Sequence, residues 1–400
     1  CGRSGDRAAG GRGGEGGEGG FNYSGWSPQN ESDLLPVVDA KELSPDAFYA
    51  DFIAKRRPVR IRGTLEEEGW RAAERWDASY LRRHAGDANV KVEQRSSLKE
   101  SFGKGKTQSM RFGDFVKDMA GGKLYMTSQD TEDGELFASP IRELHERRDF
   151  PLRPRIIPGL VPANISLWMG STSSASSSGL HHDYHDNLYI LLEGSKKFTL
   201  YSPEYAQAMR TNGAIDCVHP NGMISYVGHE THADGSTEQE RRRLEAKAKV
   251  LEAERDLQAL EDGCECDPSL LEAAEGRLDE ALDMELSLEA GQEAEGEEES
   301  GKTEPRNFSS LTEEEQGRLK GKCKALEVCI GAGEMLYLPC GWFHNVTSCN
   351  SGAPYHLALN YWFYPPDNES GAVKDPYSHR SRAVLWESNE YARGGAVDNW

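Results

Sequence analysis

Three histidines and two aspartates crowd the start of an otherwise apolar run, in the stretch "GLHHDYHDNLYILLEGSKKF" at residues 179–198. If this run is a strand that has begun by residue 181, alternate side chains share a face. One face would then carry a row of polar side chains, namely His181, Asp183, His185, Asn187 and Tyr189. Buried polar groups at this density need hydrogen-bond partners or a metal ion. The sequence therefore predicts a metal-binding face on a buried strand.

A third metal ligand is expected from a distant strand, and His344 in "GEMLYLPCGWFHNV" (333–346) is the candidate. With His181 and Asp183 it would form a set of two imidazoles and one carboxylate, which leaves coordination positions open as in non-haem Fe(II) oxygenases. Ligand type alone does not select iron over manganese or zinc. The competing interpretation is that these are polar residues satisfied by ordinary hydrogen bonds, which would be preferred if the His-x-Asp pair stood alone.

The two other histidines of the stretch are not expected to bind the metal. His182 has the opposite strand parity and would face away from the ligands. His185 shares their parity but lies further along the strand, and we expect it at the mouth of a substrate site.

A buried lysine is the second unusual feature. Residues 193–195 are expected to form a tight turn into a partner strand, on which Lys196 shares a face with Phe198 and Leu200. An interior ammonium is costly unless it meets an anion. A dicarboxylate cosubstrate whose far carboxylate reaches Lys196 would remove that cost. The alternative is a lysine at a strand end whose ammonium extends to solvent.

Positioning these residues requires a β scaffold. From Asn164 onward, short apolar segments separated by Gly and Pro turns dominate. Before that point the pattern favours helices, beginning with one that Ser44 caps and Pro45 opens, followed by others near 76–86 and 112–122. Helices followed by short strands predict a mainly β fold, an antiparallel barrel or sandwich with helices packed outside it.

Residues 237–304 interrupt the β pattern. Helical spacing in 237–260 and again in 270–290, with a Gly and Pro turn between them, predicts an αα-hairpin followed by an acidic tail. The segment 238–304 has 23 acidic and 8 basic residues, a net charge of −15 out of −21 for the chain. The acidity belongs to this insert, and nothing in the sequence supports nucleic-acid binding.

The chain divides into three predicted parts. Residues 1–30 form a Gly-rich disordered tail, 31–366 form the β domain with its insert, and 367–400 form a C-terminal tail with a candidate helix at 378–392. Eight scattered cysteines without a paired CxxC motif favour a reducing compartment, and no apolar run is long enough to cross a membrane. We expect a cytoplasmic or nuclear location. A removed targeting peptide stays open, because the chain begins with Cys1.

The stretches "LHHDYHDNLYILLEGSKKFTLYSP" (180–203), "GEMLYLPCGWFHNV" and "LALNYWF" (357–363) resemble the JmjC (Jumonji C) family of Fe(II)- and 2-oxoglutarate-dependent oxygenases. Within that family the chain is most similar to the small JmjC-only protein hydroxylases, in particular the lysyl hydroxylases. The resemblance covers roughly 43–364 without the helical insert. It implies a cupin jelly roll, that is, a double-stranded β-helix barrel.

The resemblance also implies roles for individual residues. His181, Asp183 and His344 would bind Fe(II), and O₂ would use a coordination position that they leave open. Lys196 would pair with the C5 carboxylate of 2-oxoglutarate. Further residues would bind or orient the cosubstrate: Tyr189, Ser178, Asn187, Asn360 and Tyr125. The Ser-rich approach to His181 leaves Ser177 as an alternative to Ser178, and Tyr125, Trp168 and Asn360 equally suit plain core packing.

The implied activity is hydroxylation of a protein side chain. The alternatives are a lysine demethylase, an RNA hydroxylase, and a non-catalytic cupin scaffold whose acidic hairpin recruits a basic partner. Family members of this size often dimerise through C-terminal helices, so a homodimer is a further expectation. We expect a protein substrate, no membrane and no direct nucleic-acid contact.

Overall fold

A computed structural model describes most of the chain. The described residues are 21–30, 32–63, 65, 70–95, 105–128, 135–171, 177–263, 268–290, 305–319, 321–349, 352–368 and 374–388. Residues 1–20 of the predicted N-terminal tail lie outside this set, whereas its last ten residues, 21–30, are described. The acidic tail 291–304 and residues 389–400 of the predicted C-terminal segment also lie outside it.

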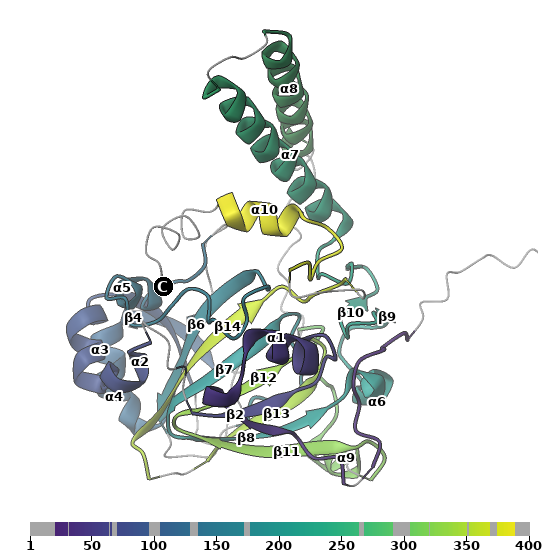
Figure 1. Ribbon diagram of the computed structural model, residues 1–400. Helices are drawn as coiled ribbons and strands as arrows, with labels where there is room; N and C mark the ends of the chain where they lie inside the picture. Colours follow the sequence, from purple (N-terminus) through teal and green to yellow (C-terminus); the bar gives the residue numbers. More distant parts are fainter. Residues whose placement is uncertain are drawn as a thin grey trace, which may run out of the picture.

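Helices from the N-terminal part of the chain pack outside the strands of the barrel (Figure 1). Ser44 caps α1 (Pro45–Phe48), its Oγ accepting a hydrogen bond from the Ala47 amide at 3.2 Å, and a π-helical turn continues it to Ile53. Asp77 caps α3 (Ala78–Ala85) in the same way, its side chain accepting a hydrogen bond from the Tyr80 amide at 2.7 Å. The described helices after α1 are α2 (Ala72–Arg75), α3 (Ala78–Ala85), α4 (Phe112–Asp118), α5 (Ile141–His145), α6 (Ala206–Met209), α7 (Glu238–Glu261), α8 (Pro268–Ala290), α9 (Glu313–Leu319) and α10 (Ser381–Ser388).

Strands form one large and one small sheet of the barrel. The large sheet has the order β1 (Val37–Asp39), β2 (Val59–Arg62), β12 (Glu334–Leu338), β7 (Asp186–Glu193), β14 (Tyr355–Phe363), β6 (Pro162–Ser171), β5 (Leu124–Thr127), β3 (Asn89–Gln94) and β4 (Lys106–Arg111). The small sheet has the order β11 (Ala325–Gly331), β8 (Ser195–Tyr201) and β13 (Phe343–Cys349), and β9 (Ile215–Val218) pairs separately with β10 (Ile224–Tyr226). The mainly β jelly roll is confirmed.

The expected pairing of the strands on either side of residues 193–195 is wrong. β7 pairs with β12 and β14, whereas β8 pairs with β11 and β13, so the turn passes from one sheet to the other. Gly194 permits this tight turn, since its φ is +93° and a β-carbon there would lie 2.9 Å from the Cβ of His356. The local sequence predicts the turn, but not the sheet that follows it.

Two apolar layers cover the two faces of the large sheet. Its outer face packs on the N-terminal helices through residues such as Leu188, Ile190 and Leu359. Its inner face packs against the small sheet, where Leu191 and Leu336 meet Phe198. Because β14 is covered on both faces, all nine of its residues are buried. The polar cavity described below lies within the inner layer.

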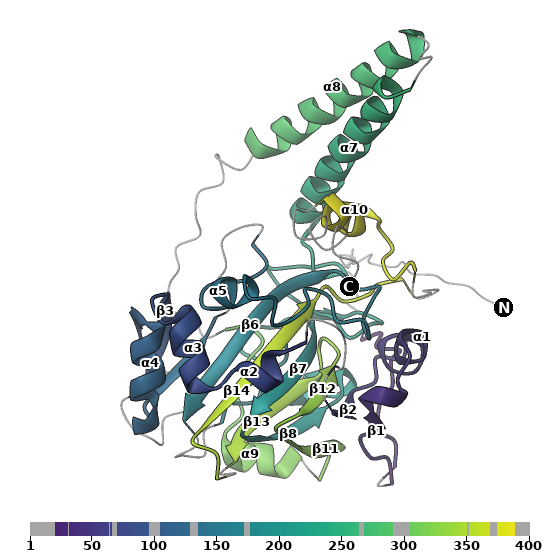
Figure 2. The ribbon, with the colours of Figure 1, turned by 60° about the vertical axis from the view of Figure 1, so that its left-hand side comes forward.

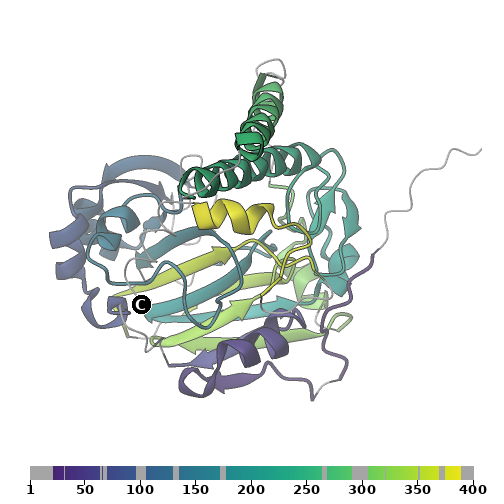
Figure 3. The ribbon, with the colours of Figure 1, turned by 45° about the horizontal axis from the view of Figure 1, so that its top comes forward.

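The inserted helical hairpin is confirmed. Helices α7 and α8 pack along each other and rise away from the barrel, with α10 against the base of α7 (Figures 1 and 2). Viewed from above, the hairpin stands beside the end of the barrel that carries α10 (Figure 3). A capping box at Thr237 and Glu240 starts α7. No helix among the described residues has both the length and the apolar character needed to cross a membrane.

Candidate metal centre and cosubstrate pocket

The predicted ligands His181, Asp183 and His344 come together, but two of them lie in a loop and not on a strand. β7 begins at Asp186, so the expectation that the strand starts by residue 181 is wrong. Instead the loop is held against the first residues of β13. The amide of His181 donates to the carbonyl of His344 at 3.0 Å, and the amide of His344 donates back at 2.6 Å. This backbone exchange fixes the distance between the two histidines.

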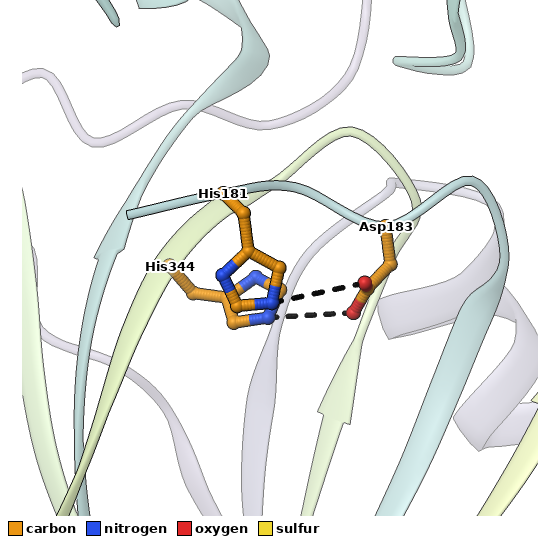
Figure 4. A group of neighbouring side chains, drawn as sticks. All are labelled: His181, Asp183 and His344. Atoms are coloured by element: carbon orange, nitrogen blue, oxygen red, sulfur yellow. Dashed lines mark ion pairs between the residues drawn. The ribbon is translucent and has the colours of Figure 1, made fainter. Parts of the chain in front are cut away.

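The three side chains converge on one point (Figure 4). Nε2 of His344 lies 3.3 Å from one carboxylate oxygen of Asp183, and Nε2 of His181 lies 3.9 Å from the other. One ligand atom from each residue fits within 4.8 Å of the others. Atoms that each bind an ion at about 2.0–2.2 Å must lie this close together. Two imidazoles and a carboxylate therefore fit a divalent transition metal.

Contacts behind the ligands orient both imidazoles. The Nδ1 atom of His181 lies 3.0 Å from the carbonyl oxygen of Gly179, and that of His344 lies 2.9 Å from the carbonyl oxygen of Trp342. If Nδ1 carries the proton and donates it to these carbonyls, each Nε2 keeps its lone pair for a metal. The ring of Phe308 also stacks on His181, with centroids 4.7 Å apart and planes 9° apart.

The electrostatics of the triad suit metal binding. Burial, together with His344, lowers the pKa of His181 to about 4, so this imidazole is neutral at pH 7. Burial would raise the pKa of Asp183, but His344 outweighs it and lowers that pKa to about 2. Burial would lower the pKa of His344, but the neighbouring Asp183 outweighs burial and raises that pKa. A cation placed here would compete with the proton that His344 binds.

The same cavity reaches Lys196. Its volume is about 50 Å³, enough for more than one water-sized group. Lys196 is 4% exposed and points inward with Phe198 and Leu200, as strand parity predicts. Its Nζ donates to the Ser348 hydroxyl at 2.8 Å and lies 5.6 Å from the centre of the Tyr125 ring. The cavity thus joins a metal-type ligand set to a buried ammonium.

The residues expected to bind or orient the cosubstrate also line this cavity. Their full set is Tyr125, Ser178, Asn187, Tyr189 and Asn360, together with Ser177 and Trp168. Both serines, the predicted one and its alternative, are therefore present. The Asn360 amide donates to Oδ1 of Asn187 at 3.3 Å, whereas its own buried Oδ1 has no hydrogen-bond partner among the described residues. Unsatisfied buried polar atoms are costly, so this cavity fits a polar occupant.

The other two histidines do not join the triad. His182 is fully buried and lies with Nε2 2.6 Å from the Tyr226 hydroxyl. His185 packs against Trp362 and Tyr364, with ring centroids 6.4 Å and 5.4 Å away. Trp362 lines the cavity, so His185 lies one residue behind its wall.

A buried ion pair ties the two ligand-bearing segments together. The guanidinium of Arg56 is bidentate on Asp186, at 2.5 and 2.8 Å, and the side chains are 4% and 0% exposed. The same carboxylate accepts hydrogen bonds from the Tyr337 hydroxyl at 2.6 Å and from the Cys340 amide at 2.9 Å. Asp186 follows Asp183 by three residues and Cys340 precedes His344 by four. This pair therefore holds the two loops in register.

Sequence reasoning missed several residues of the site. Ser348 could have been found, because it shares the strand parity of His344 and Val346 on β13. Phe308 and Arg56 could not, because they lie far from the ligands in sequence and nothing in their own surroundings marks them. Their contacts with His181 and Asp186 arise only from the fold.

Comparisons with known proteins show the family of this chain. A family model described as "Cupin-like domain" matches residues 45–369. JmjC domain-containing protein 4 of Schizosaccharomyces pombe is 31% identical over 453 aligned residues, covering 94% of this chain and 93% of the relative. The human bifunctional peptidase and (3S)-lysyl hydroxylase JMJD7 is 26% identical, covering 42% of this chain and 54% of its own length. The lysine-specific demethylase JMJ32 of Arabidopsis thaliana is 24% identical, covering 58% and 49%. This chain belongs to the JmjC family of cupin-like proteins.

Proposed function

We propose that the protein is an Fe(II)- and 2-oxoglutarate-dependent dioxygenase that hydroxylates a protein side chain. The observation that carries this proposal is the single cavity that joins the His181, Asp183 and His344 triad to the buried ammonium of Lys196. A 2-oxoglutarate molecule has an oxo-acid end that suits a metal and a second carboxylate that suits an ammonium. Neither group of residues alone would specify that cosubstrate.

The residues of the chain have separate tasks in this proposal. His181, Asp183 and His344 hold Fe(II) and leave coordination positions open. Lys196 and Ser348 bind the far carboxylate of 2-oxoglutarate, and Asn360 offers its unpaired oxygen within the same cavity. Fe(II) held by these three residues would supply, with 2-oxoglutarate and O₂, the chemistry that turns a substrate C–H bond into C–OH, and 2-oxoglutarate would leave as succinate and carbon dioxide.

The apolar walls of the cavity restrict water. Phe198, Leu336 and Leu338 line it from both sheets and are buried. A dry wall strengthens the interaction between Lys196 and a carboxylate, because charges interact more strongly at low dielectric. It also shields reactive species from solvent.

Mass spectrometry of candidate protein substrates tests this proposal. With Fe(II), 2-oxoglutarate and O₂, the wild-type chain should add one oxygen atom to a side chain, and the Asp183→Ala variant should not. Loss of methyl groups from methyl-lysine, with formaldehyde release, would instead establish the demethylase named for the Arabidopsis relative. If neither product appears and neither Fe(II) nor 2-oxoglutarate binds, the barrel is a scaffold.

A further inference from the structure

We propose that the outer face of α8 is a docking surface for a cationic, leucine-bearing helix of another protein. This face, called here the α8 stripe, consists of Glu275, Asp279, Leu282, Asp283 and Leu286, all exposed. Their spacing of four, seven, eight and eleven residues from Glu275 places them on one side of the helix. Binding there is independent of chemistry at the triad.

The stripe is not used within the described molecule. α8 packs on α7 through its opposite side, where Ala274 and Ala281 are buried. Leu282 is 38% exposed and Leu286 is 61% exposed. A β-carbon added at Gly276 would meet no atom within 4 Å, so the surface beside the stripe is open. Because Leu282 and Leu286 are four residues apart, both can contact the same face of a partner helix.

The negative charge of α8 favours a cationic partner. Along its 23 residues the helix has seven acidic residues and one basic residue, Arg277. Arg277 faces α7, where its guanidinium lies 3.7 Å from Asp256. The carboxylates of Glu275, Asp279 and Asp283 therefore surround the leucines without a compensating cation on the same face. A helix with leucines on one side and lysines or arginines at its margins would complement both features.

The same charges disfavour other occupants. A second copy docked through this face in antiparallel fashion would place carboxylate opposite carboxylate. Nucleic acids and anionic membranes carry the same sign of charge as the stripe. A basic protein helix is the class that remains.

The hairpin is anchored, so a docked partner would have a defined position. Arg382 of α10 pairs with Asp234 at 2.8 Å, and its guanidinium lies 3.7 Å from the centre of the Tyr364 ring. Further along α7, Glu245 lies 3.3 Å from Nδ1 of His379. Tyr364 also packs against His185, which lies behind the cavity wall, so these contacts link the base of the hairpin to the cavity of the triad. A partner held on α8 would project over this side of the barrel.

Fluorescence anisotropy of the full-length chain tests the proposal. The probe is a fluorescein-labelled helical peptide of leucine and lysine with all leucines on one side, and the control peptide has the same composition in shuffled order. The wild-type chain should bind the probe saturably and more tightly than the shuffled peptide. Together Leu282 and Leu286 expose about as much surface as one fully exposed leucine, so Leu282→Gln with Leu286→Gln should weaken binding about tenfold or more.

Matched controls separate the α8 stripe from general charge attraction. Leu34→Gln with Val227→Gln removes two other exposed apolar side chains, 74% and 60% exposed, and should leave binding unchanged. Asp279→Lys should weaken binding, whereas Glu313→Lys on α9 should not. Equal binding of both peptides, or equal binding by the wild-type chain and the leucine variant, would overturn the proposal. So would a dimer in sedimentation velocity that the leucine variant abolishes, because the face would then belong to a second copy.

Discussion

Replacing Arg56 by methionine should destabilise the protein strongly. The substitution leaves the Asp186 carboxylate 0% exposed without its cation, and removing one partner of a buried ion pair costs about 3–5 kcal/mol. Tyr337 and Cys340 still donate to the carboxylate, which favours the lower end, about 3 kcal/mol. Arg56 has a φ of +53°, but methionine also carries a β-carbon, so backbone strain is the same in both proteins.

Urea unfolding followed by tryptophan fluorescence measures this loss. The control is Arg60→Met, which breaks a partly exposed pair with Glu334 (27% and 18% exposed) and should cost at most about 1 kcal/mol. Asp186→Asn added to Arg56→Met should recover part of the loss, because the unpaired charge is gone. If Arg56→Met costs no more than Arg60→Met, or if the Arg56 and Asp186 changes are additive, the reasoning is refuted.

Three further predictions concern the site. Lys196→Met should lower 2-oxoglutarate affinity at least about thirtyfold in anaerobic calorimetry, because a buried charge-assisted contact is worth about 2–5 kcal/mol. Lys197→Met, on the half-buried Lys197 paired with Glu327 at 2.9 Å, should not lower it, and equal losses would contradict the assigned role. Phe308→Ala should weaken metal binding about tenfold in a competition assay with a coloured chelator, since contacts that orient ligands contribute this much, whereas Phe308→Tyr should retain it. Metal affinity should fall as the pH drops through the raised pKa of His344. The reason is that this imidazole stays protonated to a higher pH than the usual 6.5, and the metal ion must displace that proton. A metal affinity that does not change between about pH 6 and 8 would contradict this.

Local signals predicted those parts of the fold that depend on local interactions. The cap at Ser44 and the helical spacing of the insert give helices close to the predicted bounds. Strand parity correctly placed Lys196 among apolar side chains, because β8 is a regular buried strand. These features depend on neighbours within a few residues.

Contacts between residues far apart in the sequence determine the features of the site and the sheets that the sequence did not predict. The loop at His181 takes its shape from backbone bonds to His344 and from Phe308, which follows the insert. Parity assumes a strand, so it grouped His185 with the ligands although β7 begins only at Asp186. The pairing of β7 with β12 and β14 likewise depends on strands far along the chain.

Anaerobic binding of Fe(II) and 2-oxoglutarate, followed by succinate release when O₂ is admitted, tests the proposed oxygenase most directly. The wild-type chain should bind both and release succinate, even slowly and without a substrate protein. Asp183→Ala should lose metal binding, and Lys196→Ala should lose 2-oxoglutarate binding while keeping the metal. A wild-type chain that binds neither, or variants that release succinate at the wild-type rate, would contradict the assignment of this cavity.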